Sequence, residues 1–444
     1  MNKFFIPGAR LAFAASIVLL PFRFRFTLLA RPIGTIYNDY TDLLLFTSDL
    51  FVILTLALWT ITRAREPNRI SFGSRALTLA IFGLTAIAFV IAPFSIDPLL
   101  AFYHAIRLTL LGALYLFVIN EITLGWIAIP AAIQIFIQAT VGIAQVLRQH
   151  SIGLSWLGEY ELDPAWRGVS IVWAEGVRSL RAYGLTDHPN ILGGCFAFAL
   201  LMLVAWRIHR DERWSAPIVA VFALGTLGLL ITFSRAAYLA FGAGIGSMLI
   251  LFFATKQTRA LRDLIALIFA ALVLIAPFVW HNANYLGVRL NAVGASGVVG
   301  ADSAMLERGA LNSAANRIFV DAPIFGIGVG ALPQAMRARF PDFPLNYQPA
   351  HIALLNAAAE TGIGGALFYA LALIAPWCAL WINRRRLNFS PALVGVSAAL
   401  LAVTLIGFFD YYTWLLAPGR LWQWTIWGAW SALYRASFIG ATHV

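Results

Sequence analysis

Long apolar runs dominate the chain, separated by short polar segments. Twelve of the runs are long enough to cross about 30 Å of hydrocarbon as helices. They span residues 6–22, 43–61, 76–94, 101–120, 122–147, 190–207, 216–232, 235–254, 262–280, 351–382, 391–409 and 420–437. The pattern predicts an all-α polytopic membrane protein with about twelve transmembrane helices.

Two long segments interrupt this pattern, at residues 148–189 and 281–350. Loops of this length in a compact protein are usually functional, so we expect the chemistry to lie there. The larger segment forms an external loop between the ninth and tenth helices. The predicted units are helices 1–5, an external loop, helices 6–9, the large external loop and helices 10–12, at residues 1–147, 148–189, 190–280, 281–350 and 351–444.

Arginines cluster in the short loops that follow the second, sixth, eighth and tenth runs. Such loops lie on the cytoplasmic side of a bacterial inner membrane, which places both termini in the cytoplasm and the two long segments outside. The basic residues are Arg63, Arg65, Arg69, Arg75, Arg207, Arg210, Arg213, Lys256, Arg259, Arg262, Arg384, Arg385 and Arg386.

The N-terminus resembles a secretory signal, because Lys3 and Arg10 precede the run from Leu11 to Leu20. No small-residue cleavage site follows; the next residues, 21–25, read Pro-Phe-Arg-Phe-Arg. We expect a retained first helix, with a cleaved signal as the alternative.

Composition supports a lipid environment. The chain is 61% hydrophobic and 11% charged, and its mean hydropathy is +0.80. The formal charge of +11 is almost all arginine, with lysine only at Lys3 and Lys256. This favours topology signals and anionic lipid ligands over a nucleic-acid partner. The two cysteines, Cys195 and Cys378, lie in apolar runs and are too few for a disulfide framework or a cysteine metal site.

The larger external segment contains an amphipathic pattern. Apolar residues recur every fourth position beside a parallel polar stripe, and Pro323 ends the pattern. The apolar set is Leu306, Ala310, Ala314 and Ile318, and the polar set is Arg308, Asn312 and Asn316. The helix either contributes to a site or lies on the membrane interface.

Arg235 follows Ser234 at the start of the eighth run, with Ser234 as the expected N-cap. A cation at this end opposes the helix dipole, unless an anion binds there to the free amides and the guanidinium together. The alternative is an interfacial arginine that extends to lipid headgroups.

His351 opens the tenth run, where a neutral imidazole can take a proton from a hydroxyl, although a lone histidine is often structural. Glu360 follows on the same predicted helix but on its opposite side. It is either a functional carboxylate or a buried partner for an arginine or the backbone.

The first external segment ends in a basic and polar stretch suited to sugars and phosphates, although an ordinary turn also explains it. Its polar residues include Arg178, Arg181, His188 and Asn190. Residues 326–330, Gly-Ile-Gly-Val-Gly, are expected to form a tight turn, because no strand precedes them and no Lys-Ser follows. Nothing in the sequence indicates a metal site or a covalent nucleophile.

These motifs, in order, resemble the family of O-antigen ligases and O-antigen polymerases, over about the C-terminal 270 residues. The family has a Ser-Arg at the head of a late helix, a large external loop and a histidine at the exit of that loop. The matching features are Pro189-Asn190, Ser234-Arg235, Arg308 followed by Pro323–Gly328, Ala350-His351 and Glu360–Gly365. One departure is His351-Ile352 where the family commonly has His-Asn, and Asn356 lies too far round the helix to replace that asparagine.

The resemblance implies a glycosyltransferase that needs no metal or cofactor and acts on the external face. It would move a glycan from a polyprenyl-diphosphate carrier to a hydroxyl on a lipid or glycan acceptor such as lipid A core, with inversion. Arg235 and Arg308 would clamp the diphosphate, with Arg181 as a third candidate, and His351 would orient or deprotonate the acceptor. Further substrate-binding candidates are Arg178, Arg181, His188, Asn190, Asn312 and Glu360.

Three alternatives stay open. A polysaccharide polymerase or a protein O-oligosaccharyltransferase would share the donor chemistry and differ in the acceptor. A transporter for a lipid-linked sugar or an anion would use the intramembrane charges Arg107, Glu360 and Asp410. A non-catalytic membrane scaffold would leave Arg235 unexplained.

Overall fold

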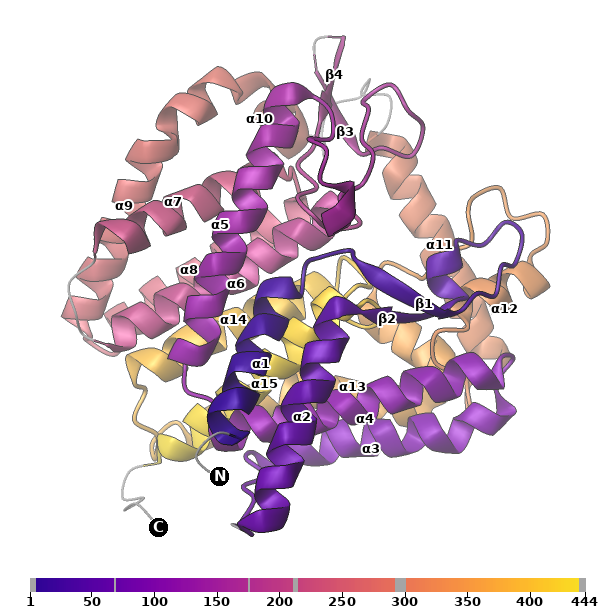
Figure 1. Cartoon of the computed structure of the whole chain (residues 1–444), viewed down its shortest axis with the longest axis horizontal. Coiled ribbons are helices and arrows are strands. Elements are labelled where there is room, and N and C mark those ends of the chain that lie inside the picture. The colour runs from indigo at the N-terminus through magenta and orange to yellow at the C-terminus, as the bar shows by residue number, and fades with distance from the viewer. Residues whose placement is uncertain (1–4, 68, 175, 211–214, 292–300, 439–444) are drawn as a thin grey trace.

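The computed structural model describes residues 5–67, 69–174, 176–210, 215–291 and 301–438, and these are mostly helical (Figure 1). The long and intermediate helices are α1 (Phe5–Leu19), α2 (Thr47–Arg65), α3 (Arg75–Ile91), α4 (Pro98–Glu121), α5 (Gly125–Arg148), α6 (Pro189–His209), α7 (Ala216–Ile231), α8 (Arg235–Ala254), α9 (Thr258–His281), α10 (Ala283–Asn291), α11 (Ala301–Asp321), α12 (Leu332–Arg339), α13 (Ala353–Asn383), α14 (Pro391–Gly407) and α15 (Ala417–Ala436). Short 3₁₀ turns are η2 (Asn38–Tyr40), η3 (Ala92–Phe94) and η4 (Ser155–Leu157).

Each of the twelve predicted spans coincides with a helix. Eight described helices are long and apolar enough to cross a membrane, and α1, α7 and α14 are shorter apolar helices. Helix α15 carries polar residues such as Arg420 and Gln423, but both are buried against neighbouring helices. The chain is therefore a polytopic helical membrane protein, and the count of twelve spans stays a prediction.

The mostly helical chain agrees with the predicted all-α class, and the structure adds two short antiparallel hairpins. Strands β1 (Arg25–Leu29) and β2 (Leu43–Phe46) pair with each other, as do β3 (Ile171–Ala174) and β4 (Val177–Leu180). The second span was predicted to begin at residue 43 but begins at Thr47. The Asp49 carboxylate accepts a hydrogen bond from the Phe46 amide at 3.0 Å and so fixes this start.

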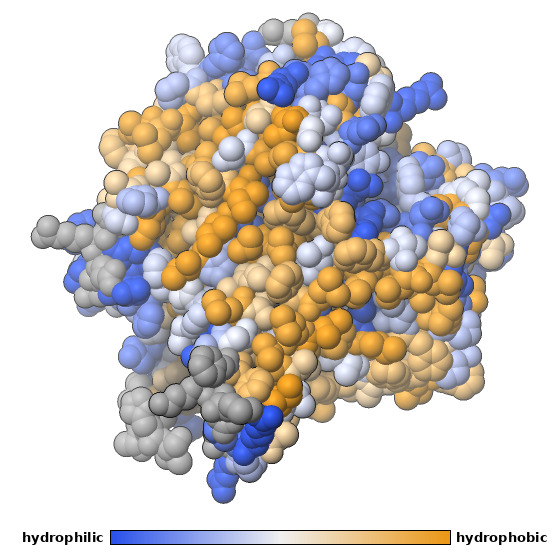
Figure 2. Space-filling view, in the orientation of Figure 1, coloured by the Kyte–Doolittle hydropathy of each residue, from blue (hydrophilic) through white to orange (hydrophobic). Residues whose placement is uncertain are grey.

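Helix α6 lies at the centre of the bundle and is buried along nearly its whole length. It packs against α5, α8 and α14, while α15 packs against α4 and α14. Figure 2 shows a broad hydrophobic surface over the helices, with hydrophilic residues gathered towards the top, the right edge and the lower left. This distribution suits a bundle surrounded by lipid between two aqueous faces.

Helix α13 is broken at Gly362, whose φ is +64° and ψ is −171°. The predicted turn at residues 326–330 is confirmed, with positive φ at Gly326, Gly328 and Gly330. This turn docks on the break: the Gly328 amide donates to the Glu360 carbonyl at 2.9 Å. The docked turn therefore supports α13 at its break, about two and a half turns into the helix.

The large segment 281–350 contains α10, α11 and α12; its residues 292–300 lie outside the described part of the chain. The amphipathic helix is confirmed as α11, which ends before Pro323. Ala314 and Ile318 are buried as predicted, together with Leu311 and Ala315. Leu306, in contrast, is 73% exposed, so the buried face begins later than the pattern indicated.

Residues 23–46, here called the N-terminal strap, connect α1 to α2 and contain the first hairpin. Arg25 forms ion pairs with Asp39 and Asp187, and Arg23 pairs with Asp187 at 2.7 Å. Ile36 forms a bridge to Tyr347, in the segment that precedes His351. The strap therefore joins segment 148–189 to the segment that leads into α13.

Candidate functional site

His351 lies between the α12 segment and α13, two residues before the helix begins. The prediction that His351 opens the helix is therefore wrong. Because His351 lies outside the helix, its position relative to Glu360 does not follow from helical periodicity. The His351 backbone amide donates to Asn312 Oδ1 at 2.9 Å, so α11 holds the histidine from the side. Its ring lies edge-on to the Tyr411 ring, with centroids 5.4 Å apart.

Asn356 holds the backbone on both sides of His351. Its Oδ1 accepts from the Ala350 amide at 2.9 Å, and its Nδ2 donates to the carbonyls of Ala350 at 2.6 Å and Ile352 at 2.9 Å. We expected Asn356 to lie too far round the helix to replace the asparagine that commonly follows the histidine in the family. Its hydrogen bonds go to the backbone on either side of His351, so that expectation stays a prediction.

Asp410 is the carboxylate that faces His351. His351 Nδ1 is buried, lies 3.8 Å from Asp410 Oδ1 and makes no hydrogen bond, and the side chain as a whole is 17% exposed. Catalytic hydrogen bonds are often long before substrate binds. The arrangement lets Asp410 orient the ring so that Nε2 faces an incoming group.

A chain of hydrogen-bonded polar side chains runs from Asp410 towards segment 148–189. Asn190 Nδ2 donates to Asp410 Oδ2 at 3.2 Å, and Arg181 Nη2 donates to Asn190 Oδ1 at 2.7 Å. Arg181 is 4% exposed, and its Nε also donates to the Thr232 carbonyl at 2.7 Å. The predicted site residues Arg181 and Asn190 are therefore joined to Asp410, which the sequence did not indicate as a site residue.

Two other candidates from that segment have different positions. His188 caps α6, because its Nδ1 accepts from the Asn190 amide at 3.1 Å while its Nε2 lies 2.9 Å from Ser170 Oγ. Arg178 is exposed on β4, opposite Trp173. His188 therefore contacts the backbone of Asn190, at the edge of the hydrogen-bonded network. Among the described contacts, none joins Arg178 to that network.

Arg235 and Arg308 approach the same region from α8 and α11. The two positive charges repel each other, and the charge of Arg308 also disfavours protonation of His351. Among the described residues neither arginine has a carboxylate within ion-pair distance. Two cations are thus held near each other beside a histidine, an arrangement that an anion would stabilise.

The turn before Arg235 has an unusual backbone conformation. Ser234 occupies the predicted N-cap position, but its side chain makes no capping hydrogen bond. Phe233 has a φ of +49°, which is rare for a bulky residue and is associated with functional sites. The strained turn directs α8 so that its first residue, Arg235, lies near Arg308.

Burial lowers the pKa of His351, and the nearby Arg308 charge lowers it further, while Asp410 opposes both. Burial and Arg308 together outweigh Asp410, so the pKa of His351 lies below its ordinary value and the imidazole is neutral at neutral pH. A neutral imidazole can accept a proton from a hydroxyl, as a general base must.

Glu360 has a different role from the one predicted for a substrate-binding residue. It is fully buried, and its Oε2 accepts from the Gly330 amide and from Trp414 Nε1, both at 2.8 Å. These contacts favour the alternative of a buried partner for the backbone. Glu360 secures the docked glycine turn and does not reach the surface in this conformation.

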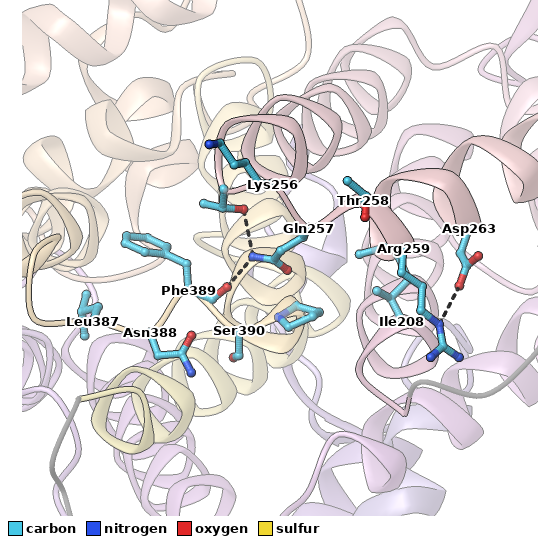
Figure 3. Close-up of a pocket in the computed structure, with 13 residues that line it drawn as sticks. Ile208, Lys256, Gln257, Thr258, Arg259, Asp263, Leu387, Asn388, Phe389 and Ser390 are labelled. Atoms are coloured by element: carbon cyan, nitrogen blue, oxygen red, sulfur yellow. Dashed lines mark hydrogen bonds and ion pairs between the residues drawn. The ribbon is translucent and has the colours of Figure 1, made fainter.

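Two large pockets open on the described surface. One, of about 920 Å³, lies between the N-terminal strap, α11, α12 and the segment before His351. The other, of about 890 Å³, lies far from His351 at the α8–α9 turn (Figure 3). Within the described residues no three His, Cys, Asp or Glu side chains come together as metal ligands.

Comparison with known proteins agrees with the resemblance in the sequence. Residues 218–370 match the family model described as O-antigen ligase, a range that contains Arg235, Arg308 and His351. None of the curated proteins compared with the chain matches it.

Proposed function

Because its central region carries the O-antigen ligase match, we propose that this protein transfers a glycan from a polyprenyl-diphosphate carrier to a hydroxyl on a lipid or glycan acceptor. The observation that supports this most directly is the pair Arg235 and Arg308, which lack carboxylate partners in the described chain and lie beside a neutral histidine. A diphosphate leaving group needs fixed positive charge, and these arginines supply it.

The proposed reaction is a direct displacement. His351 Nε2 takes the proton of the acceptor hydroxyl, and the oxygen attacks the anomeric carbon from the side opposite the diphosphate. The bond between the anomeric carbon and the diphosphate oxygen breaks, and its electron pair leaves with the diphosphate. The anomeric configuration therefore inverts, and no metal or cofactor takes part.

Asp410 is a positioning residue in this scheme. Its carboxylate faces His351 Nδ1, so it keeps the proton on that nitrogen and stabilises the imidazolium that forms. Asn190 and Arg181 hold Asp410 in turn. The scheme therefore gives Arg181 a supporting role in place of a direct diphosphate contact.

The pocket of about 920 Å³ is the proposed place for the sugar units. Its lining combines stacked aromatic rings with polar side chains, as sugar sites commonly do. Phe343 and Tyr347 are stacked with centroids 5.9 Å apart, and Gln334, Arg337 and Asn346 also line the pocket. The pocket reaches α11 at Glu307, next to Arg308.

The proposed location is a bacterial inner membrane, with the site on the external face and both termini in the cytoplasm. The arginine-rich loops support this orientation; residues 1–4, 211–214 and 439–444 lie outside the described chain. The charges expected to line a transport path each contact a different partner: Arg107 pairs with Asp49, Glu360 accepts from Trp414, and Asp410 accepts from Asn190. This favours an enzyme over a transporter.

The test is a reconstituted transfer assay with purified protein, a glycan-loaded polyprenyl-diphosphate carrier and separate acceptors: lipid A core, a second carrier-linked glycan, and a protein. The wild type should glycosylate one acceptor class, and His351→Ala should not. The acceptor class then distinguishes a ligase, a polymerase and a protein oligosaccharyltransferase. Movement of the carrier across the bilayer without glycan transfer would favour the transporter and refute the proposal.

A further inference from the structure

The pocket in Figure 3 lies among the basic loops, on the side of the bundle away from His351. It is formed where the end of α6, the α8–α9 turn and the α13–α14 loop meet. The lining residues are Ile208, Thr255, Lys256, Gln257, Thr258, Arg259, Ala260, Asp263, Leu387, Asn388, Phe389, Ser390 and Pro391. Its volume of about 890 Å³ is that of a ligand site.

The charged residues of this pocket favour an anion. Lys256, at its edge, forms no ion pair within the described chain, and its φ is +56°. Asp263 lies 3.9 Å from Arg259 Nε and 3.3 Å from Arg262 Nη2, so its negative charge is compensated. Lys256 is then the cation available to a ligand, and its constrained backbone keeps it at this turn.

Backbone groups add to this preference. Helix α9 begins at Thr258, inside the pocket, and the Gln257 side chain does not cap it. The first amides of a helix of this length attract phosphate groups. Lys256 and these amides supply polar groups to the pocket. Leu387 and Phe389 form an apolar side, and Ile208 lies apart from them, beside Arg259 (Figure 3).

Gln257 indicates that the ligand also donates a hydrogen bond. Its Nε2 donates to the Phe389 carbonyl at 2.7 Å and to Thr255 Oγ1 at 2.9 Å, as Figure 3 shows. Its Oε1 is buried and accepts from no donor in the described chain. A buried acceptor without a partner is unfavourable, and a ligand hydroxyl would satisfy it.

We propose that this pocket binds the headgroup of an anionic glycerophospholipid whose headgroup carries free hydroxyls. The phosphate lies on Lys256 and the first amides of α9, a headgroup hydroxyl donates to Gln257 Oε1, and the glycerol backbone lies against the apolar side. Basic pockets between transmembrane helices on the cytoplasmic side are suited to anionic lipids. This site is independent of the proposed glycan transfer.

The experiment uses the full chain in nanodiscs of phosphatidylethanolamine, with and without phosphatidylglycerol. Retained lipid is counted by native mass spectrometry, and the unfolding temperature is recorded. Lys256→Gln should reduce retained phosphatidylglycerol at least tenfold. Lys256→Gly removes the same charge and suits the positive φ, so it should give the same loss in a chain that stays folded.

The control is Arg75→Gln, which removes a charge from another basic loop and should retain the lipid as the wild type does. Gln257→Leu should weaken retention of phosphatidylglycerol more than that of phosphatidic acid, which has no headgroup hydroxyl. Equal retention by wild type and both Lys256 variants would overturn the proposal, as would an equal loss in Arg75→Gln. If soluble glycerol phosphate stabilised the chain as much as the lipid does, the site would be one for a soluble phosphate and the proposal would fail.

Discussion

The arginines of the N-terminal strap and the two arginines beside His351 have opposite surroundings. In the strap, Arg25 pairs with both Asp39 and Asp187, and Arg31 lies 2.7 Å from Asp97. Arg235 and Arg308 have no such carboxylate in the described chain, and their charges oppose each other. The first set is stabilised within the fold, whereas the proposed function has the second set stabilised by a bound diphosphate. The presence or absence of a carboxylate partner therefore distinguishes arginines that support the fold from those proposed to bind substrate.

The largest expected effect is on catalysis. Arg308→Ala and Arg235→Ala should each lower glycan transfer by about 10²–10³-fold, because each removes a charge from the diphosphate site. Neither should lower the unfolding temperature of the ligand-free protein, since no ion pair is lost and a repulsion is relieved. Arg308→Lys should also reduce transfer, because an ammonium cannot make the two-pronged phosphate contact. Loss of stability in Arg308→Ala would place Arg308 with the structural arginines.

A backbone change should destabilise the scaffold that carries His351. Gly362→Ala places a side chain at a φ of +64°, and the new Cβ would lie 2.1 Å from the Ile324 carbonyl oxygen. We expect a loss of about 3 kcal/mol or more in the free energy of unfolding, measured by thermal denaturation in detergent. Gly242→Ala is the matched control, because no heavy atom lies within 4 Å of its added Cβ. Equal stability of the two variants would contradict the docked-turn description.

The strap arginines should show the reverse of the first prediction. Arg25→Ala leaves Asp39 and Asp187 without their shared cation, so the free energy of unfolding should fall by about 1–2 kcal/mol. Transfer by the molecules that stay folded should change less than tenfold. Parallel measurement of denaturation and of transfer per folded molecule tests this. A hundredfold loss of transfer at unchanged stability would remove the distinction between the two sets.

The smallest expected effect is a shift in pH dependence. Transfer should fall as the pH drops through the pKa of His351, which lies below its ordinary value because of burial and Arg308. Asp410→Asn removes the charge that raises this pKa, so the acid limb should move to lower pH. Arg308→Gln removes a charge that lowers it, so the acid limb of the residual activity should move to higher pH. Each shift should be up to about one pH unit. If the acid limb of both variants stayed at the pH of the wild type, His351 would be excluded as the base.

The sequence predicted the helices well, because lipid imposes long apolar runs on any spanning helix. It missed the strap hairpin, whose strands are short and lie directly beside apolar runs. The start of α2 was placed too early for this reason: residues 43–46 are as apolar as the helix that follows. Hydropathy does not distinguish a strand from a helix over so few residues.

The candidate site was predicted in part. The motifs indicated Arg235, Arg308 and His351, and the structure brings them to one region, with Asn312 holding the histidine backbone. The sequence did not indicate that Asp410 faces His351, because the two residues flank different helices and no local pattern links them. Asp410 was noticed only as a charge near the membrane, and a search for acidic residues just after predicted spans would have raised its priority.

The position of Asn356 has a similar explanation. The expected asparagine directly after the histidine is absent, and a helix beginning at His351 would have turned Asn356 away. The structure begins α13 two residues later, so the preceding backbone comes within reach of the Asn356 side chain. The sequence did not indicate these backbone contacts because the helix boundary was placed two residues too early.

The most direct test of the central claim is the release of polyprenyl diphosphate from a glycan-loaded carrier in liposomes. Wild type, Arg308→Ala, His351→Ala and Arg25→Ala should be compared with acceptor and a metal chelator present. We predict that wild type releases the carrier with chelator present, that Arg25→Ala retains release per folded molecule, and that the other two variants lose it. Release that survived both Arg308→Ala and His351→Ala would contradict the proposed site, and chelator-sensitive release would contradict the metal-independent mechanism.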